Sequence, residues 1–221
     1  MNDRSRRTLN PEKRPPPWQA VVTGGSAGSM EALEAILTRL PAAFPLPVLC
    51  VQHMHPSGTD FLARHLDDRC RLAIREACDK EPVRPGHVYM APPDYHLLVE
   101  RDETLALSVD EKVNYSRPSI DVLFESAAQV WGSRLVAVVL SGSNHDGAAG
   151  ARCIREGGGL VVAQDPETAE QPAMPRAAMQ AADSEVVLSP DRIADLLLEI
   201  SGMGEGDGDM PTALREEDGH G

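Results

Sequence analysis

Short, almost continuous runs of valine, leucine and alanine alternate with helical patterns along most of this chain. Such runs occur at residues 20–23, 46–51, 135–140 and 160–163. Between them, apolar side chains recur at helical spacing, as at residues 29–40. Strands that are apolar on both sides are typical of parallel sheets covered by helices on both faces. The sequence therefore predicts an α/β fold, with a doubly wound, mostly parallel sheet and helices on both faces.

The middle of the chain interrupts this alternation. Residues 86–91, 95–101 and 104–109 are short alternating runs separated by turn residues, and this spacing indicates hairpin strands. We therefore expect a small antiparallel hairpin insertion. The remaining patterns predict two more strands, at 71–77 and 184–188, and helices at 59–68, 118–131, 147–156 and 190–200.

The two ends of the chain differ in composition from the rest. Residues 1–17 are basic and proline-rich, and residues 202–221 are rich in glycine and acidic residues without apolar periodicity. Such compositions favour flexible segments, because they cannot bury enough apolar surface to fold. We expect a flexible lead-in at 1–17, one folded domain at 18–201 and a disordered tail at 202–221.

The overall composition excludes several classes of partner. A net charge of −13 argues against generic binding to nucleic acid or to anionic membranes, since both need a positive surface. No apolar segment follows the basic N-terminal residues as in a signal peptide, and no apolar stretch approaches the length of a membrane span. These observations favour a cytoplasmic protein with no nucleic-acid partner and no membrane insertion.

Three polar residues follow three of the apolar runs. Ser26 follows the first run, His53 follows the second, and Asp146 follows the run at 135–140. Because the carboxyl ends of parallel strands converge on one crevice, we expect these side chains to lie close together. A serine, a histidine and an aspartate placed there are a candidate nucleophile, general base and orienting acid. The arrangement predicts a hydrolase.

The glycines around Ser26 carry a second prediction. Residues 24–28 (GGSAG) indicate a tight turn from a strand into a helix. The N-terminus of that helix offers free N–H groups to a developing oxyanion. The alternatives are an ordinary turn or capping serine and a phosphate-binding loop, although the segment has neither the Walker lysine nor a complete G-x-G-x-x-G motif.

His53 and Asp146 also have other interpretations. His53 taken alone is typical of a hydrogen-bonded core histidine, and Asp146 is well placed to cap the helix expected after it. A metal-dependent hydrolase is a further alternative, because His55 and His145 could join His53 and Asp146 as ligands. Against it, no acidic residue closely flanks His53 and His55.

Taken together, these segments resemble the bacterial chemotaxis receptor protein-glutamate methylesterase family. Residues 24–33 (GGSAGSMEAL) resemble its serine loop, and residues 51–54 (VQHM) resemble its histidine segment. The similarity continues through the central hairpin, the aspartate region and two later segments, at 85–97, 117–124, 140–148, 163–165 and 173–178. It covers nearly all of residues 18–200 in order.

The resemblance implies a doubly wound α/β catalytic domain that hydrolyses γ-glutamyl methyl esters on the cytoplasmic helices of methylated chemoreceptors. Some members also deamidate glutamine, and no cofactor or metal is implied. The resemblance assigns Ser26 as nucleophile, His53 as general base and Asp146 as the acid that orients the histidine. We expect the backbone N–H groups of Ala27 and Ser143 to stabilise the oxyanion at the substrate edge.

Two loops depart from the family pattern. Ala27, Gly28 and Ser29 stand where the family usually has a threonine and two glycines, and residues 142–145 replace a Gly-Met-Gly segment. The alternative is therefore a catalytically weakened signalling or binding module of the same fold. Typical members also carry an N-terminal receiver domain, which residues 1–17 are too few to form. This leaves a receiver protein acting in trans as a second expected partner.

Overall fold

A parallel sheet of seven strands forms the centre of the molecule in the computed structural model, which describes residues 18–53 and 61–203. The strand order is β3-β4-β2-β1-β7-β8-β9. The bounds are β1 Ala20–Gly25, β2 Val48–Gln52, β3 Ala73–Glu76, β4 His87–Met90, β7 Leu135–Val139, β8 Leu160–Gln164 and β9 Val187–Leu188. The predicted fold class is confirmed. The predicted lead-in at 1–17 and most of the predicted tail lie outside the described residues.

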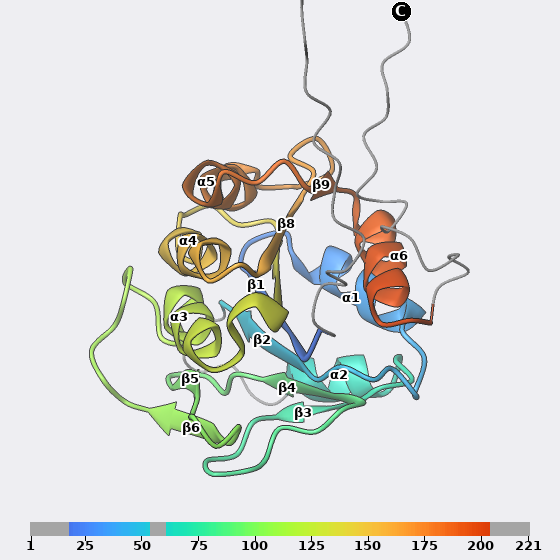
Figure 1. The fold of residues 1–221 in the computed structure, drawn as a ribbon, viewed down its shortest axis with the longest axis vertical. Coiled ribbons are helices and arrows are strands. Elements are labelled where there is room, and N and C mark those ends of the chain that lie inside the picture. Colours follow the sequence, from blue (N-terminus) through green and yellow to red (C-terminus); the bar gives the residue numbers. More distant parts are fainter. Residues whose placement is uncertain (1–17, 54–60, 204–221) are drawn as a thin grey trace, which may run out of the picture.

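Six helices cover the two faces of this sheet in the described part of the chain. They are α1 Met30–Arg39, α2 Phe61–Asp67, α3 Ile120–Trp131, α4 Ala148–Glu156, α5 Ala173–Ala182 and α6 Pro190–Ile200, with a short 3-10 helix at Gly132–Arg134. Helices α3, α4 and α5 lie side by side on one face, and α1, α2 and α6 lie on the other (Figure 1). Among the described residues, no helix is long and apolar enough to cross a membrane.

Burial on both faces explains why the central strands read as continuous apolar runs. Every residue of β7 is buried, because α1 and α6 pack over one side of the sheet and α3 to α5 over the other. Helix α1 buries a stripe of side chains that recur at helical spacing, Ala32, Leu33, Ile36 and Leu37. Helix α1 ends at Arg39, with Leu40 as its C-cap and Pro41 next in the chain, because proline cannot continue a helix.

The hairpin prediction was wrong for its first strand. Residues 86–91 were expected in the antiparallel insertion, but β4 pairs in parallel with both β2 and β3 in the central sheet. Only β5 (His96–Val99) and β6 (Leu105–Ser108) form an antiparallel pair. The reason is burial: Val88, Tyr89 and Met90 are all buried, so β4 is a core strand, whereas a hairpin strand would expose alternate residues.

One helix was not predicted from the apolar pattern of the sequence. Helix α5 (Ala173–Ala182) contains a proline and five alanines, and this composition gives only a weak apolar period. Its place is determined by packing, since α5 lies against α4 and β8 and buries Met174, Ala178 and Ala182 in the core on that face.

The topology brings three strand ends to one point. From β1 the chain builds β2, β3 and β4 on one side and then crosses to β7 on the other side of β1. The order of connection therefore reverses between β1 and β7. In open α/β sheets, ligands bind at the carboxyl edge beside such a reversal, and the three predicted catalytic residues follow β1, β2 and β7.

Candidate active site

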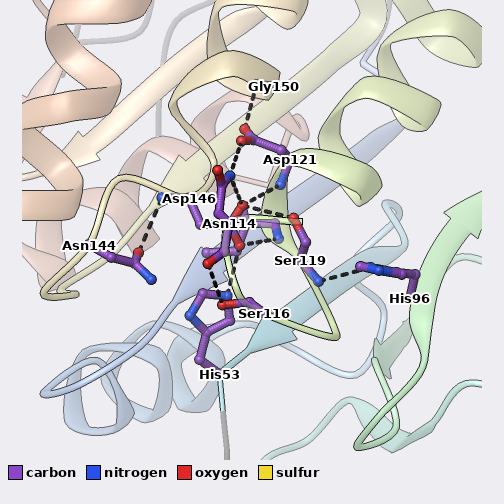
Figure 2. A network of polar contacts seen from close by, with 10 residues as sticks. His53, His96, Asn114, Ser116, Ser119, Asp121, Asn144, Asp146 and Gly150 are labelled. Atoms are coloured by element: carbon purple, nitrogen blue, oxygen red, sulfur yellow. Dashed lines mark hydrogen bonds and ion pairs between the residues drawn. The ribbon is translucent and has the colours of Figure 1, made fainter. Parts of the chain in front are cut away.

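Asp146 lies at the centre of the polar network at this edge (Figure 2). Its side chain is fully buried, and its carboxylate accepts five hydrogen bonds. Oδ2 accepts from His53 Nε2 at 2.8 Å and from the backbone N–H of Ile120 at 2.7 Å. Oδ1 accepts from Asn114 Nδ2 at 2.9 Å, Ser119 Oγ at 2.8 Å and the backbone N–H of Asp121 at 3.2 Å. This carboxylate cannot turn without breaking several bonds.

Asp146 caps a helix, but not the helix that the alternative interpretation expected. Helix α4, which follows Asp146 in the sequence, has no side-chain cap. The carboxylate instead accepts the first two N–H groups of α3. Ile120, the first residue of α3, packs directly against Gly24 and Gly147, where a Cβ atom would overlap its side chain. Two glycines thus let α3 begin close enough to reach the carboxylate.

These contacts also determine the charge of Asp146. Burial alone would raise its pKa, but hydrogen bonds from His53, Asn114, Ile120 and Ser119 together lower the pKa below the usual value. The favourable end of the α3 dipole acts in the same direction. Asp146 is therefore a carboxylate at neutral pH.

Asp121 is a second buried carboxyl group beside the first. It accepts from Gly150 N–H at 2.7 Å and from Asn114 Nδ2 at 2.7 Å, so the Asn114 amide bridges the two acids. Burial raises the pKa of Asp121, and the negative charge of Asp146 raises it further, although the hydrogen bonds from Gly150 and Asn114 oppose this. Two adjacent acids thus have pKa shifts of opposite sign.

His53 lies at the end of β2, next to the loop that contains Ser26. Its backbone N–H donates to Gly25 O at 3.0 Å, which extends the β1–β2 ladder by one residue. Because Asp146 is ionised and can only accept, the proton on the histidine ring lies on Nε2. In the neutral ring, the lone pair is then on Nδ1.

The backbone of Ser26 is held from three directions. Its N–H donates to Ser141 O at 2.9 Å, and its carbonyl accepts from Gln52 Nε2 at 2.9 Å. Ser29 Oγ lies 2.6 Å from the same carbonyl and 2.7 Å from Gln52 Oε1. Among the described residues, the Ser26 hydroxyl itself has no hydrogen-bond partner, and the side chain is only half-buried.

The two predicted oxyanion donors lie on exposed loops next to this backbone. Ala27 O accepts from Ser141 Oγ at 2.8 Å, and Gly142 is bonded to Gln171 O and to the Met174 N–H, both at 2.9 Å. In the described part of the chain, neither the Ala27 N–H nor the Ser143 N–H donates to another residue.

The alternative metal ligands are only partly described. His55 lies outside the described residues, and His145 is exposed. Residues 18–53 and 61–203 contain no group of three histidine, cysteine or acidic side chains placed to hold a metal ion. The five donors around Asp146 already occupy its oxygens, so this carboxylate has no free electron pair directed to a metal.

Fold and site together define a class of α/β protein with a buried aspartate–histidine pair beside a serine loop at the sheet reversal. The CheB methylesterase family model matches residues 21–197. A putative protein-glutamate methylesterase/protein-glutamine glutaminase of Leptospira interrogans is 46% identical over 183 residues, covering 83% of this chain and 95% of the relative. The protein-glutamate methylesterase/protein-glutamine glutaminase of Symbiobacterium thermophilum is 41% identical over 188 residues, covering 85% of this chain and 52% of the relative.

A solved structure agrees with these relatives. The crystal structure of the Thermotoga maritima CheB methylesterase catalytic domain matches with a TM-score of 0.79 and 36% identity, covering 83% of this chain and 98% of that chain. This chain belongs to the CheB methylesterase family, and the resemblance described for the sequence is confirmed. The assignment of roles to Ser26, His53 and Asp146 stays a prediction.

Sequence reasoning missed the residues that hold these three in place. Asn114, Ser119, Gln52 and Ser29 all bond to the aspartate or to the serine loop. Ser119 precedes a helical pattern and is typical of an ordinary cap, but its hydroxyl donates to Asp146 and makes no cap bond. A serine that caps α3 and a serine that bonds Asp146 differ only in how close Asp146 lies in space. That distance cannot be read from the sequence.

Proposed function

We propose that this protein is a serine esterase that removes methyl groups from glutamate γ-methyl esters on the cytoplasmic helices of chemoreceptors, with glutamine deamidation as a second reaction. The observation that carries the proposal is the 2.8 Å bond between His53 and Asp146 beside Ser26, in a chain of the methylesterase family. The catalytic unit is residues 18–201, and its substrates place it in the cytoplasm.

Acylation begins at Nδ1, the ring nitrogen of His53 that does not bond Asp146. Nδ1 takes the proton of the Ser26 hydroxyl while Oγ attacks the carbonyl carbon of the methyl ester. The resulting imidazolium gives this proton to the departing methoxide, and methanol leaves. The γ-glutamyl group is then bound to Ser26 as an ester.

Deacylation repeats these steps with water as the nucleophile. Nδ1 accepts a proton from the attacking water and returns it to Ser26 Oγ, which releases a free glutamate side chain. For a glutamine substrate, ammonia is the first leaving group and the rest is unchanged. The use of Nδ1 as base is the reverse of the serine-protease arrangement, in which Nδ1 binds the aspartate.

Two parts of the site stabilise charge during these steps. The Ala27 and Ser143 N–H groups stabilise the tetrahedral oxyanion, which backbone donors can do whatever side chains the loops carry. The lowered pKa of Asp146 keeps it ionised, so that its charge stabilises the imidazolium. Its bond to His53 orients the ring, and the other four bonds fix the carboxylate.

The deciding experiment measures methanol release from methylated receptor fragments by wild type, Ser26→Ala and Ser133→Ala. Ser133 is exposed in the 3-10 helix before β7, at the opposite edge of the sheet, so this matched control should retain full activity. Ser26→Ala should lose nearly all turnover and all labelling by a fluorophosphonate probe. Full turnover in Ser26→Ala, or turnover that a chelator abolishes and zinc restores, would contradict the serine mechanism.

Absence of turnover in the wild type has a separate meaning. A wild-type protein that binds methylated fragments without releasing methanol, and that the probe does not label, would be the weakened binding module. The observation that favours this second candidate function is the altered sequence of the two loops at 27–29 and 142–145.

A further inference from the structure

The loop between β6 and α3 gathers exposed apolar side chains next to the active site. Six large hydrophobic side chains are exposed among the described residues, and three of them lie in this loop: Val109 (65% exposed), Val113 (38%) and Tyr115 (98%). A fourth, Tyr95, is 42% exposed. We refer to these four residues as the apolar rim. Figure 1 shows the loop between β6 and α3 standing away from the body of the domain.

Arg117 joins the two parts of the apolar rim. Its guanidinium donates to the carbonyls of Val109 at 2.6 Å and Asp110 at 2.9 Å. It also donates to Asp94 Oδ1, at 3.1 Å from Nε and 2.9 Å from Nη2, and Asp94 directly precedes Tyr95. The start of the loop and Tyr95 are therefore held beside each other.

Two further contacts hold the loop in place. Buried His96 reaches Glu111 O with Nε2 at 3.0 Å, and its Nδ1 accepts from Ser119 N–H at 3.2 Å. Asn114 reaches the carboxylates of Asp121 and Asp146. A loop with this many anchors presents its exposed side chains in one arrangement, so a partner need not order it on binding.

The tip of the loop is a strained turn. Val113 and Ser116 exchange backbone hydrogen bonds of 3.2 and 2.9 Å, while Asn114 (φ 50°) and Tyr115 (φ 62°) have left-handed backbones. Asparagine tolerates this conformation, but a bulky tyrosine rarely adopts it. The strain directs Asn114 inward to Asp146 and leaves the Tyr115 ring in solvent. Strain kept by surrounding contacts is typical of functional positions.

We propose that the apolar rim docks the apolar face of an amphipathic helix in the substrate protein, so that an ester-bearing side chain of that helix reaches Ser26. This inference rests on the proposed function. Tyrosine is a common anchor of protein interfaces, because it buries a large area at low conformational cost. The charged side chains of Asp110, Glu111 and Lys112 in the same loop supply the polar margin that such interfaces have.

The position of the apolar rim beside the active site indicates that it binds the substrate. Tyr115 is one residue from Asn114, whose amide bonds the aspartate that holds His53. A second copy of this chain seated there would cover Ser26 and keep substrate from it, whereas a substrate helix has to lie beside Ser26 to react. On the substrate helix, residues three and four positions apart lie on the same face. One face can therefore carry both the ester and the apolar side chains that contact the rim.

The test compares Tyr115→Asn with Met203→Asn on two substrates. Asparagine suits the left-handed turn, so the variant removes the ring and keeps the loop. Met203 is a 41% exposed apolar residue beyond α6, remote from the rim. Tyr115→Asn should raise KM for methylated receptor helices about tenfold, the loss of about 1.4 kcal/mol expected for an aromatic anchor. Its kcat, and its hydrolysis of p-nitrophenyl acetate, should stay within about twofold. Met203→Asn should match wild type.

Binding measurements separate this proposal from the proposed function. In a Ser26→Ala background, which cannot turn over, Tyr115→Asn should weaken the Kd for methylated helices by the same factor. An unchanged Kd, an equal loss of activity on both substrates, or a wild-type dimer that Tyr115→Asn dissociates would each overturn the docking surface. Absence of ester hydrolysis in the wild type, with the Kd effect intact, would overturn the proposed function alone.

Discussion

The serine loop and the aspartate pocket are held by opposite means. Asp146 is fixed through its side chain, with five donors around a fully buried carboxylate. Ser26 is fixed through its backbone, by Ser141, Gln52 and Ser29, while its hydroxyl has no partner among the described residues. In the proposed mechanism, Asp146 must keep the histidine still, whereas the Ser26 hydroxyl must move from the base to the substrate.

The comparison also separates stability from activity. Contacts of Asp146 join α3, the β6–α3 loop and β2, so the site's acid is part of the fold. The Ser26 hydroxyl contributes no described contact to the fold. Substitutions at the two ends of the proposed triad should therefore have the same effect on turnover and different effects on stability.

The largest expected effect contrasts Asp146→Ala with Ser26→Ala. Both variants should lose at least about 10⁴-fold in kcat, the order known for loss of the acid in such triads. Asp146→Ala should also lower the free energy of unfolding by several kcal/mol, because each buried donor left unpaired costs about 1–3 kcal/mol. Ser26→Ala should stay within about 0.5 kcal/mol of wild type. Urea unfolding and ester turnover test both; equal stability of the two variants would contradict the comparison.

A smaller effect is expected at Asn114, which belongs to the aspartate pocket. Asn114→Ala removes one charge-assisted bond from Asp146 and one from Asp121. Hydrogen bonds to charged groups contribute about 1.5–3 kcal/mol, so kcat on p-nitrophenyl acetate should fall by about 10- to 100-fold.

Asn114→Asp sharpens this prediction. It keeps the size of the side chain but places a third carboxyl group against Asp121 and Asp146, which repel it. We expect it to be less active than Asn114→Ala, and to recover as the pH is lowered and one carboxyl group becomes protonated. A variant Asn114→Asp as active as wild type would mean that the amide does not position Asp146.

On the serine side, Gln52→Leu and Ser29→Ala should have milder effects. Each removes one of the groups that hold the Ser26 carbonyl, at about 1 kcal/mol of stability and a few-fold loss of kcat. Because both act on one carbonyl and contact each other, the double variant should differ from the sum of the single ones. Strictly additive losses in unfolding and turnover would show that the two residues act independently.

The strands and the strand-end positions of the three site residues could be predicted because they depend on local pattern. Continuous apolar runs indicate buried parallel strands, and the carboxyl edge follows from topology. Helix α6 was predicted with the same bounds as in the structure, Pro190–Ile200, since its proline, its apolar spacing and the Ser189 before it agree.

The rest could not be predicted because it depends on contacts between distant segments. Residues 86–91 look like hairpin strands until β2 and β3 are known to flank them. Asp146 precedes α4 in the sequence but bonds to the start of α3, 26 residues away. The Asn114 bond to Asp146 spans 32 residues. Apolar periodicity in the sequence does not indicate which distant residues form hydrogen bonds with each other.

The smallest expected effect is on the pH dependence of stability, where the two buried acids oppose each other. The pKa of Asp146 is lowered in the folded state, so its contribution is present above the unfolded value of about 3.9 and is lost as the pH falls through the folded pKa. The pKa of Asp121 is raised, so the folded state takes up its proton first and gains stability as the pH falls through that value. The two slopes therefore have opposite signs, and that of Asp121 acts above the unfolded value while that of Asp146 acts below it. Asp121→Asn should therefore make acid destabilisation steeper, and Asp146→Asn should make it shallower.

Unfolding free energies in urea between pH 3 and 7 test both signs, because the other carboxyl groups are the same in the wild type and in the two variants. Identical pH slopes for both variants would mean that Asn114 does not bridge two acids of opposite shift.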